Sequence, residues 1–397
     1  MKRFKFFLLV LLVFFLTIWV VVYIFDLGYL FHGIKSTYLR GESSAQIDDY
    51  VCFDVDTVSS SRHIEIPRSS SFSNPVLSDS LDSFLRNSET VAFLVIKNDS
   101  VVYENYWGGA GVNSYTNSFS MAKSITSLLV ACAIKDGYIK SFDEPIVNFL
   151  PELKGKADGV LIKHLLEMSS GLNWLENYKR PISVTAKAYY GKRLEDLVLG
   201  RSFVEKPGVY YRYNSGNTQL LGVLLKRAVK KPISEYAGKS LWSKIGAKND
   251  ALWVVDEPGG IEKTFCCFNS NARDFAKLGL LVLNKGIVGS DTVIGEKELS
   301  FLLSSSGLID GNKKNSVTFG KKQNYYTRSW WKGKVGDIKF IYARGFLGQY
   351  IVLIPEINVV FVRLGKHENP KTALKSEYHL TDNLTFITKQ IIKEYSY

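Results

Sequence analysis

Ser120 and Lys123 stand three residues apart at the start of an apolar stretch, in the sequence Ser-Met-Ala-Lys. A serine hydroxyl becomes a good nucleophile when a neighbouring base takes its proton, and an amine of lowered pKa can be that base. Residues three apart share one face of a helix, so the two side chains can meet if the stretch is helical. The pair therefore predicts a covalent serine hydrolase with Ser120 as nucleophile and Lys123 as base.

The residues after this pair predict the helix that would position it. Apolar residues recur there with helical spacing, and Gly137 is typical of a helix C-terminus. Ser120 would then lie at the helix N-terminus, where unpaired N–H groups favour the negative charge of an attacking oxygen or an oxyanion. A second Ser-x-x-Lys, Ser329 to Lys332, lies in a Tyr- and Trp-rich stretch typical of a strand, where positions three apart face opposite sides. Only the first pair has the required geometry.

An apolar run from Phe6 to Phe25 opens the chain. About 20 helical residues span roughly the 30 Å of a bilayer core. Lys2, Arg3 and Lys5 precede the run, which by the positive-inside bias places the N-terminus in the cytoplasm and the rest of the chain outside. Residues 1–26 are thus predicted to be a cytoplasmic stub and a single-pass signal anchor. A cleaved signal peptide is the alternative, although the run is long for one and no small-x-small cleavage site is visible.

The remaining chain divides into a short polar part and a long globular part. Residues 27–75 are polar and serine-rich, and we expect a tether with a loosely packed lead-in. Residues 76–397 contain enough apolar residues for a large soluble core and are predicted to form the hydrolase domain.

Charge and ligand-forming residues exclude several classes of function. The formal net charge is +12, but the basic residues are spread along the chain and form no nucleic-acid motif, so attraction to an anionic membrane or cell wall is favoured. The four cysteines make no disulfide framework, and the five histidines show no metal-ligand spacing. We expect no metal and no cofactor.

Secondary-structure patterns at the two chain ends predict one shared sheet. Strand patterns occur at 91–97 and 101–107, and again at 338–343, 349–354 and 359–364. Helical patterns precede the first pair, around 77–85, and follow the last, at 381–395. The middle of the chain is mostly helical. This order predicts an α+β fold with an antiparallel sheet built from both chain ends, flanked by helices, and a helical insertion.

Several further motifs follow in order, and together with Ser-x-x-Lys they resemble the serine β-lactamase and penicillin-binding-protein superfamily. They are Gly137–Pro145, Phe149–Leu153, Ile162–Leu172, Pro207-Gly208 and Tyr211–Ser215. The resemblance covers 76–397 and is nearest to the esterase and 6-aminohexanoate-dimer-hydrolase-like branch. It implies that Tyr213 is a second proton carrier. The resemblance also implies that Ser215 contacts the substrate, although it offers one hydroxyl where the family usually has the amide of Asn; the alternative is that Ser215 caps a helix that starts near Asn217.

The family's last motif has two candidates here, Lys334-Val335-Gly336 and Ala343-Arg344-Gly345. The second fits the expected strand better. Gly345 would then let a substrate lie against the strand, and the backbone N–H of Phe346 would join that of Ser120 in an oxyanion hole. Ala343 replaces the usual cation, which argues against an efficient β-lactamase. Strand alternation places Arg344 on the outer face.

These observations predict a membrane-anchored serine hydrolase that cleaves an ester or amide through an acyl-enzyme on Ser120. Its partners would be a small-molecule or peptide substrate and the membrane, with the catalytic domain on the outer side. One alternative is a D-aminoacyl peptidase or penicillin-binding protein that acts on cell-wall peptides. Another is a non-catalytic binding or sensor module of the same fold. A Ser-His-Asp hydrolase is disfavoured because the sequence contains no Gly-x-Ser-x-Gly.

Overall fold

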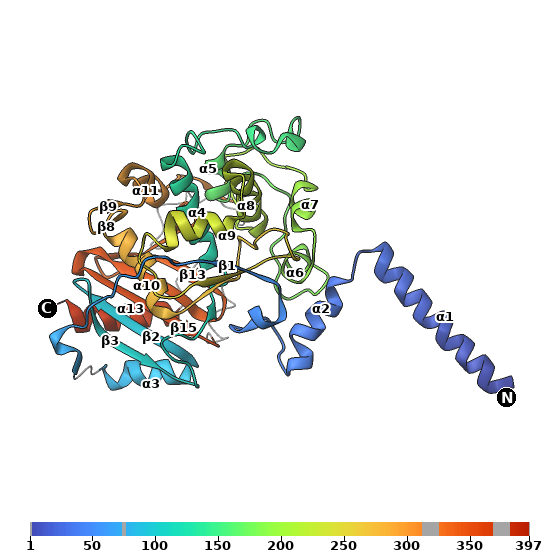
Figure 1. The fold of residues 1–397 in the computed structure, drawn as a ribbon, viewed down its shortest axis with the longest axis horizontal. Coiled ribbons are helices and arrows are strands. Elements are labelled where there is room, and N and C mark those ends of the chain that lie inside the picture. The colour runs from blue at the N-terminus through green and yellow to red at the C-terminus, as the bar shows by residue number, and fades with distance from the viewer. Residues whose placement is uncertain (1, 74–76, 312–324, 368–381, 397) are drawn as a thin grey trace.

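The computed structural model describes residues 2–73, 77–311, 325–367 and 382–396. Helix α1 (Lys2–Ile24) is long and apolar enough to cross a membrane, and it stands away from the folded domain (Figure 1). The predicted apolar helix is therefore present.

A seven-stranded antiparallel sheet forms the centre of the domain. Its order is β11-β12-β13-β14-β15-β2-β3, so β15 from the end of the chain pairs with β2 from its beginning. The fold prediction of one sheet built from both chain ends is confirmed. The strands are β2 (Thr90–Lys97), β3 (Ser100–Tyr106), β11 (Tyr325–Tyr326), β12 (Trp331–Val335), β13 (Ile338–Gly345), β14 (Gln349–Ile354) and β15 (Val359–Gly365).

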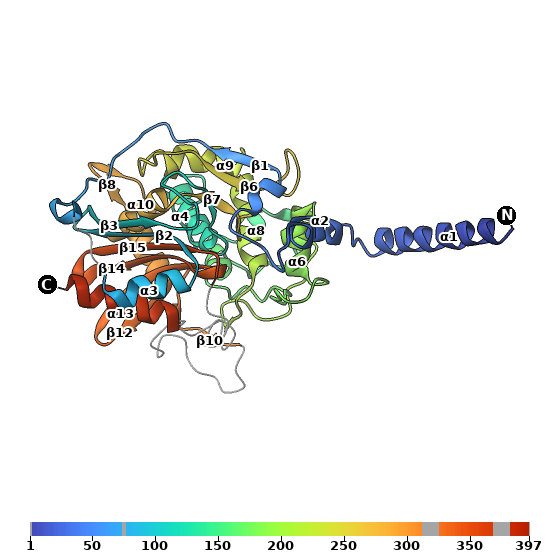
Figure 2. The same ribbon diagram turned by 90° about the horizontal axis from the view of Figure 1, so that it is seen from below.

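Helices cover both faces of this sheet (Figure 2). On one face, α3 (Asp79–Asn87) and α13 (Asp382–Tyr395) contribute leucines and isoleucines to a cluster that includes Phe93, Val352 and Phe361 of the strands. On the other face lie α10 (Ala272–Leu283) and α4 (Met121–Lys135). Because α4 packs against β13 and β14 as well as the helical insertion, its first turn lies between the two parts of the domain.

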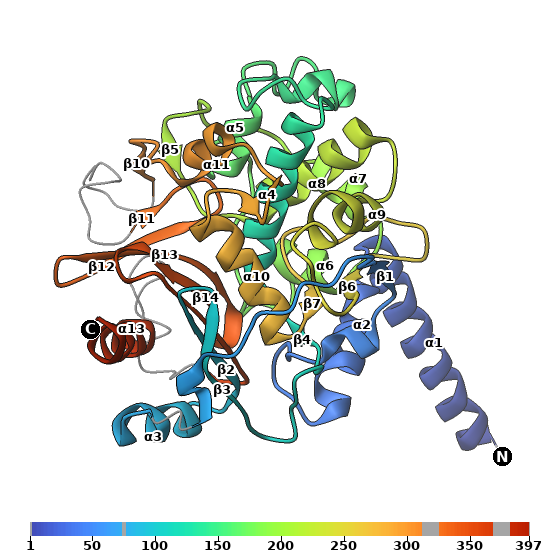
Figure 3. The same ribbon diagram turned by 60° about the vertical axis from the view of Figure 1, so that its left-hand side comes forward.

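The helical insertion follows α4 and packs against its other side (Figure 3). Its helices are α5 (Ile162–Leu166), α6 (Val184–Tyr190), α7 (Leu194–Leu199), α8 (Ser215–Val229), α9 (Ile233–Ala237) and α11 (Glu296–Leu303). A second, four-stranded sheet, in the order β1-β6-β7-β4, was not expected. Its strands are β1 (Val55–Val58), β4 (Thr116–Asn117), β6 (Ala251–Val254) and β7 (Phe268–Ser270). Short strands β5 (Tyr210–Tyr211), β8 (Ile287–Val288), β9 (Asp291–Thr292) and β10 (Ile309–Asp310) complete the domain.

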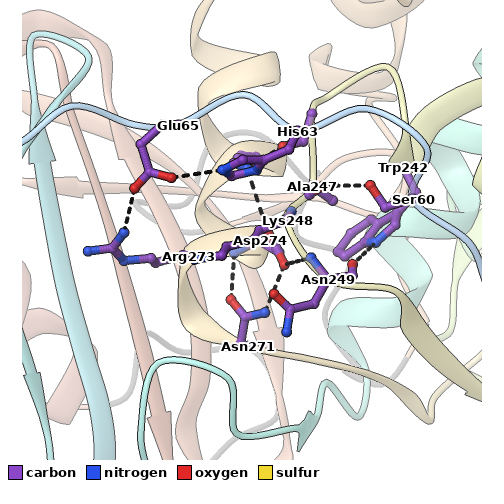
Figure 4. A network of polar contacts seen from close by, with 12 residues as sticks. Ser60, His63, Glu65, Trp242, Ala247, Lys248, Asn249, Asn271, Arg273 and Asp274 are labelled. Atoms are coloured by element: carbon purple, nitrogen blue, oxygen red, sulfur yellow. Dashed lines mark hydrogen bonds and ion pairs between the residues drawn. The ribbon is translucent and has the colours of Figure 1, made fainter.

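The expectation of a loosely packed lead-in is wrong for the described residues before 74. Helix α2 (Tyr29–Ser36) packs on α6, and β1 pairs with β6. Farther along, Ser60 and Glu65 contact the loop before β6 and the start of α10 (Figure 4), with Glu65 paired to Arg273 at 2.9 Å. The sparse apolar side chains Ile47, Val58 and Ile66 are buried, and they fix a segment whose serine content had indicated a tether.

Candidate active site

Ser120 occupies the N-cap position of α4, where the sequence placed it. The preceding residue, Phe119, is buried and has a left-handed backbone (φ +44°). This conformation is unfavourable for a bulky residue and persists only where the surroundings enforce it. Here the Asn117 side chain accepts from the Phe119 N–H at 2.9 Å, and the Ser118 N–H donates to the Phe268 carbonyl at 2.8 Å. The turn therefore fixes where the Ser120 hydroxyl lies.

Lys123 lies one turn along α4, and its amine donates to Ser120 Oγ at 3.1 Å. The side chain is buried, with a second bond to the Phe265 carbonyl at 2.9 Å. Burial disfavours the charged amine and lowers the pKa of Lys123 to about 8, against a smaller opposing effect of the Glu176 carboxylate. An amine with such a pKa is unprotonated often enough near neutral pH to accept a proton.

Tyr213 approaches the same two groups from the segment before α8. Its ring lies 5.1 Å from the Lys123 amine, and Ser120 is near enough to the phenol to lower its pKa against the larger effect of burial. The ring packs against Tyr326 and Trp331 of the sheet. Burial raises the pKa of Tyr213 well above its usual value, so the phenol keeps its proton at neutral pH. The structure thus brings together Ser120, Lys123 and Tyr213.

Glu176 is a site residue that the sequence analysis missed. Its carboxylate accepts from the Ser215 N–H and hydroxyl, both at 2.7 Å, and from Trp174 Nε1 at 2.9 Å. Its negative charge raises the pKa of both Lys123 and Tyr213. No local pattern marked this glutamate, because its role depends on how the loop after Leu172 folds against the start of α8.

Ser215 lies at the first turn of α8 rather than at its cap. The helix begins at Ser215, and the side chain of Asn214 caps it by accepting from the Asn217 N–H at 2.9 Å. The expectation that Ser215 caps this helix is therefore wrong. Ser215 is buried, with its hydroxyl held by Glu176. Its contact with a substrate stays a prediction.

The end of β13 lies directly against the nucleophile turn. A side chain at Gly345 would collide with the Ser118 carbonyl, two residues before Ser120, so only glycine allows this approach. Phe346 follows, and its ring contacts both Phe119 and the exposed Tyr178. The preferred last motif is thus beside Ser120, whereas Lys334 and Val335 end β12 and Gly336 begins the turn to β13. The oxyanion role of the Phe346 N–H stays a prediction.

Arg344 alternates with Ala343 and Gly345 along β13, and it pairs with Tyr350 of β14. Its positive charge acts on Tyr213, where it lowers the pKa of the phenol against the larger effect of burial. Ala343, by contrast, is fully buried and contributes no charge.

The segment whose Phe265 carbonyl binds the Lys123 amine also contains a disulfide that the sequence analysis did not predict. Cys266 and Cys267, directly after Phe265, form a disulfide between neighbouring residues. Trp253 Nε1 donates to the Cys266 carbonyl at 3.2 Å, which fastens this segment to β6. Among the described residues, no group of three or more His, Cys, Asp or Glu is placed to hold a metal ion.

Comparison with known proteins agrees with this arrangement. The family model described as Beta-lactamase matches residues 81–384. The 6-aminohexanoate-dimer hydrolase of Paenarthrobacter ureafaciens is 26% identical over 314 residues, which are 74% of this chain and 76% of that protein. A beta-lactamase of Providencia stuartii is 26% identical over 171 residues, 43% of this chain and 41% of that protein.

Solved structures show the same fold. A putative 6-aminohexanoate-dimer hydrolase from Bacillus anthracis matches with a TM-score of 0.71 at 19% identity, covering 86% of this chain and 92% of that one. A penicillin-binding protein homologue from Pyrococcus abyssi matches with a TM-score of 0.55 at 16% identity, covering 73% of this chain and 72% of that one.

Proposed function

Because the chain belongs to the beta-lactamase family of serine hydrolases, we propose that it cleaves an ester or amide through an acyl-enzyme on Ser120, with Lys123 and Tyr213 as proton carriers. The observation that carries this proposal is the buried Lys123 amine, 3.1 Å from Ser120 Oγ and beside the Tyr213 ring. A surface lysine would be protonated at neutral pH and could not act as a base.

In acylation, neutral Lys123 takes the Ser120 proton as Oγ attacks the substrate carbonyl carbon. The tetrahedral oxyanion then lies near the N-terminus of α4, where the Ser120 N–H is available, and the Phe346 N–H completes the oxyanion hole. Tyr213 passes its proton to the departing alkoxide or amine and takes the Ser120 proton from Lys123 in exchange, which leaves the acyl group on Ser120 and Lys123 neutral again. Its proton-retaining phenol suits this step.

Deacylation repeats these steps with water as the nucleophile. Neutral Lys123 takes the proton from water as its oxygen attacks the acyl carbon, the bond from that carbon to Ser120 Oγ breaks, and Tyr213 gives its proton to Ser120 Oγ and regains one from Lys123. Gly345 lets the end of β13 lie against the nucleophile turn, and Glu176 holds the start of α8 in position through Ser215.

The location of the enzyme is the second part of the proposal. Helix α1 anchors the chain, with Lys2, Arg3 and Lys5 on the cytoplasmic side and the hydrolase domain outside. Protease added to intact cells should digest the domain and leave α1 with the membrane. A mature protein whose N-terminus starts after residue 24 would instead establish cleavage of a signal peptide.

A fluorophosphonate probe tests the enzymatic proposal, since it reacts with activated serines. We expect intact-mass analysis to show one adduct on the wild type, none on Ser120→Ala, and an unchanged adduct on the matched control Ser127→Ala from the same helix. Absence of an adduct on the folded wild type would contradict the mechanism and favour a binding or sensor module.

Ester turnover and penicillin labelling, the latter read by intact mass, together distinguish the substrate classes. Rapid turnover of short p-nitrophenyl esters without penicillin labelling would favour the esterase or amidase. A persistent penicilloyl adduct on Ser120 would favour the D-aminoacyl peptidase.

A further inference from the structure

Helix α2 presents an apolar face to the outside of the domain. Its inner side is fixed, because the Tyr29 hydroxyl donates to the Pro181 carbonyl at 3.1 Å and Gly33 lies against the Tyr190 ring. The outer side carries Phe31, Ile34 and Lys35, and Tyr38 follows in the 3-10 turn just beyond the helix end. Phe31 is 60% exposed and Tyr38 is 67% exposed. An ordinary solvent-facing helix carries polar residues in these positions.

Neighbouring segments extend this apolar surface. Leu39 follows in the turn after α2 and is 76% exposed. Ile182, next to the Pro181 that binds Tyr29, is 69% exposed. We call the surface of Phe31, Ile34, Tyr38, Leu39 and Ile182 the proximal face.

Basic residues border the proximal face. Lys35 lies within it, and exposed Lys179 and Arg180 stand directly before Pro181. The segment 27–41 contains no acidic residue, and its second basic residue, Arg40, pairs with Asp48 and Asp49. Exposed apolar rings mixed with lysine and arginine are typical of surfaces that lie in the headgroup layer of an anionic bilayer.

The position of α1 identifies the occupant of this surface. Only residues 25–28 separate α1 from α2. All three ribbon views show α1 leaving the domain beside α2 (Figures 1, 2 and 3). Asp26, just after α1, pairs with Lys187 of α6 at 2.7 Å, so the exit point of α1 is tied to the domain. Any bilayer that α1 spans therefore lies within a few residues of the proximal face.

We propose that the proximal face rests in the headgroup layer of the anionic bilayer that α1 crosses. The inference rests on the proposed anchoring and adds a second, peripheral contact to it. The loop that supplies Ile182 also supplies Tyr178, whose ring stacks on Phe346 with centroids 6.5 Å apart. The bilayer contact thus holds the loop at the mouth of the active site against the membrane surface.

Nitroxide labels on the full-length protein test this contact. In a Cys52→Ser background, Phe31→Cys, Ile34→Cys and Ile182→Cys each provide one exposed thiol, since Cys132 is buried and Cys266 is disulfide-bonded to its neighbour. Ile287→Cys is the matched control, because Ile287 is also exposed and apolar but lies on β8, at the end of the domain opposite α1 (Figure 1).

The protein is reconstituted in vesicles of phosphatidylcholine and phosphatidylglycerol, and the accessibility of each label to oxygen and to a water-soluble nickel chelate is measured. We expect the oxygen-to-nickel ratio at positions 31, 34 and 182 to exceed that at 287 by about threefold or more, as for side chains in the headgroup layer. Ratios equal to that of the control would overturn the proposal. Labels shielded from both reagents would also overturn it, because protein would then cover the face.

Two further measurements test the role of anionic lipid and the hydrolase activity independently. An unchanged ratio in vesicles of phosphatidylcholine alone would overturn the role of anionic lipid. Fluorophosphonate labelling of Ser120 in the same vesicles reports the hydrolase activity separately, so a failed bilayer contact and a failed hydrolase are distinguishable.

Discussion

Replacing Glu176 with Gln should move the activity of the enzyme to lower pH. The Glu176 charge raises the pKa of Lys123, which burial has lowered to about 8. Glutamine removes the charge but can keep the contacts: its oxygen can accept from Trp174 Nε1 and the Ser215 N–H, and its NH₂ group can donate to the Ser215 hydroxyl. The substitution therefore isolates the electrostatic effect.

The expected size follows from the titration of Lys123. At pH 7, an amine with a pKa of about 8 is unprotonated in roughly one molecule in ten, and lowering the pKa by one unit would raise this to about half. The gain in kcat/KM at pH 7 is then up to about fivefold, reduced somewhat because a base of lower pKa accepts the proton less readily. Above pH about 9, Lys123 is largely unprotonated in both enzymes, and kcat/KM of the variant should be equal to or lower than that of the wild type.

The assay is kcat/KM for one soluble ester from pH 5 to 10, because its rising limb reports the base of the free enzyme. Glu235→Gln, which removes an exposed carboxylate paired with Lys231, is the control and should leave the midpoint unchanged. A Glu176→Gln midpoint equal to that of the wild type, with an unchanged melting temperature, would refute the assignment of Lys123 as a base under the influence of Glu176.

Three other outcomes follow from the structure. Tyr213→Phe keeps the ring packing but loses the hydroxyl, so kcat/KM should fall about 10²- to 10⁴-fold at an unchanged melting temperature; a loss below tenfold would contradict proton transfer by Tyr213. Gly345→Ala should lower the free energy of unfolding by about 1–3 kcal/mol in denaturant titrations, because the added methyl collides with the Ser118 carbonyl, and full stability would show that β13 can move away. Burial lowers the pKa of Lys263 to about 7, so the unfolded chain holds this proton to higher pH than the folded one, and the free energy of unfolding should rise with pH above about 7. Lys263→Met should flatten that rise. An identical slope of the free energy of unfolding against pH in the variant would contradict burial of the neutral amine.

The sequence was sufficient to predict the helix of the nucleophile and the shared sheet. Helix α4 follows a long apolar periodicity that ends at Gly137, which has φ +80°, and the strands at both ends are bounded by clear turn residues such as Asn98-Asp99. Local patterns of this strength persist in the fold because tertiary packing reinforces them. The proximity of Tyr213 to Ser120 depended on the family resemblance, since no local rule brings together residues so far apart in the chain.

The features of the site and fold that could not be predicted depend on tertiary contacts that leave no pattern in the neighbouring sequence. Glu176 acts through the fold of a loop, and Phe265 contributes a backbone carbonyl, which any residue could supply. The lead-in looked like a tether because its few apolar residues are separated by serines, yet burial of each one contributes about 1.5–3 kcal/mol and suffices to fix it. The left-handed backbone of Phe119 is likewise imposed by its surroundings.

The pairing of β2 with β15 has a consequence for how the protein is made. In a chain synthesised from its N-terminus, the hairpin of β2 and β3 is made before the other strands of the central sheet, and residues 98–358 separate β2 from its partner strand β15. Until the last strands arrive, β2 presents a bare edge, the kind of surface on which chains aggregate. Biogenesis of this enzyme therefore depends on protecting that edge while translation runs to its end, and a truncation that removes β15 yields a misfolding-prone chain rather than a smaller enzyme.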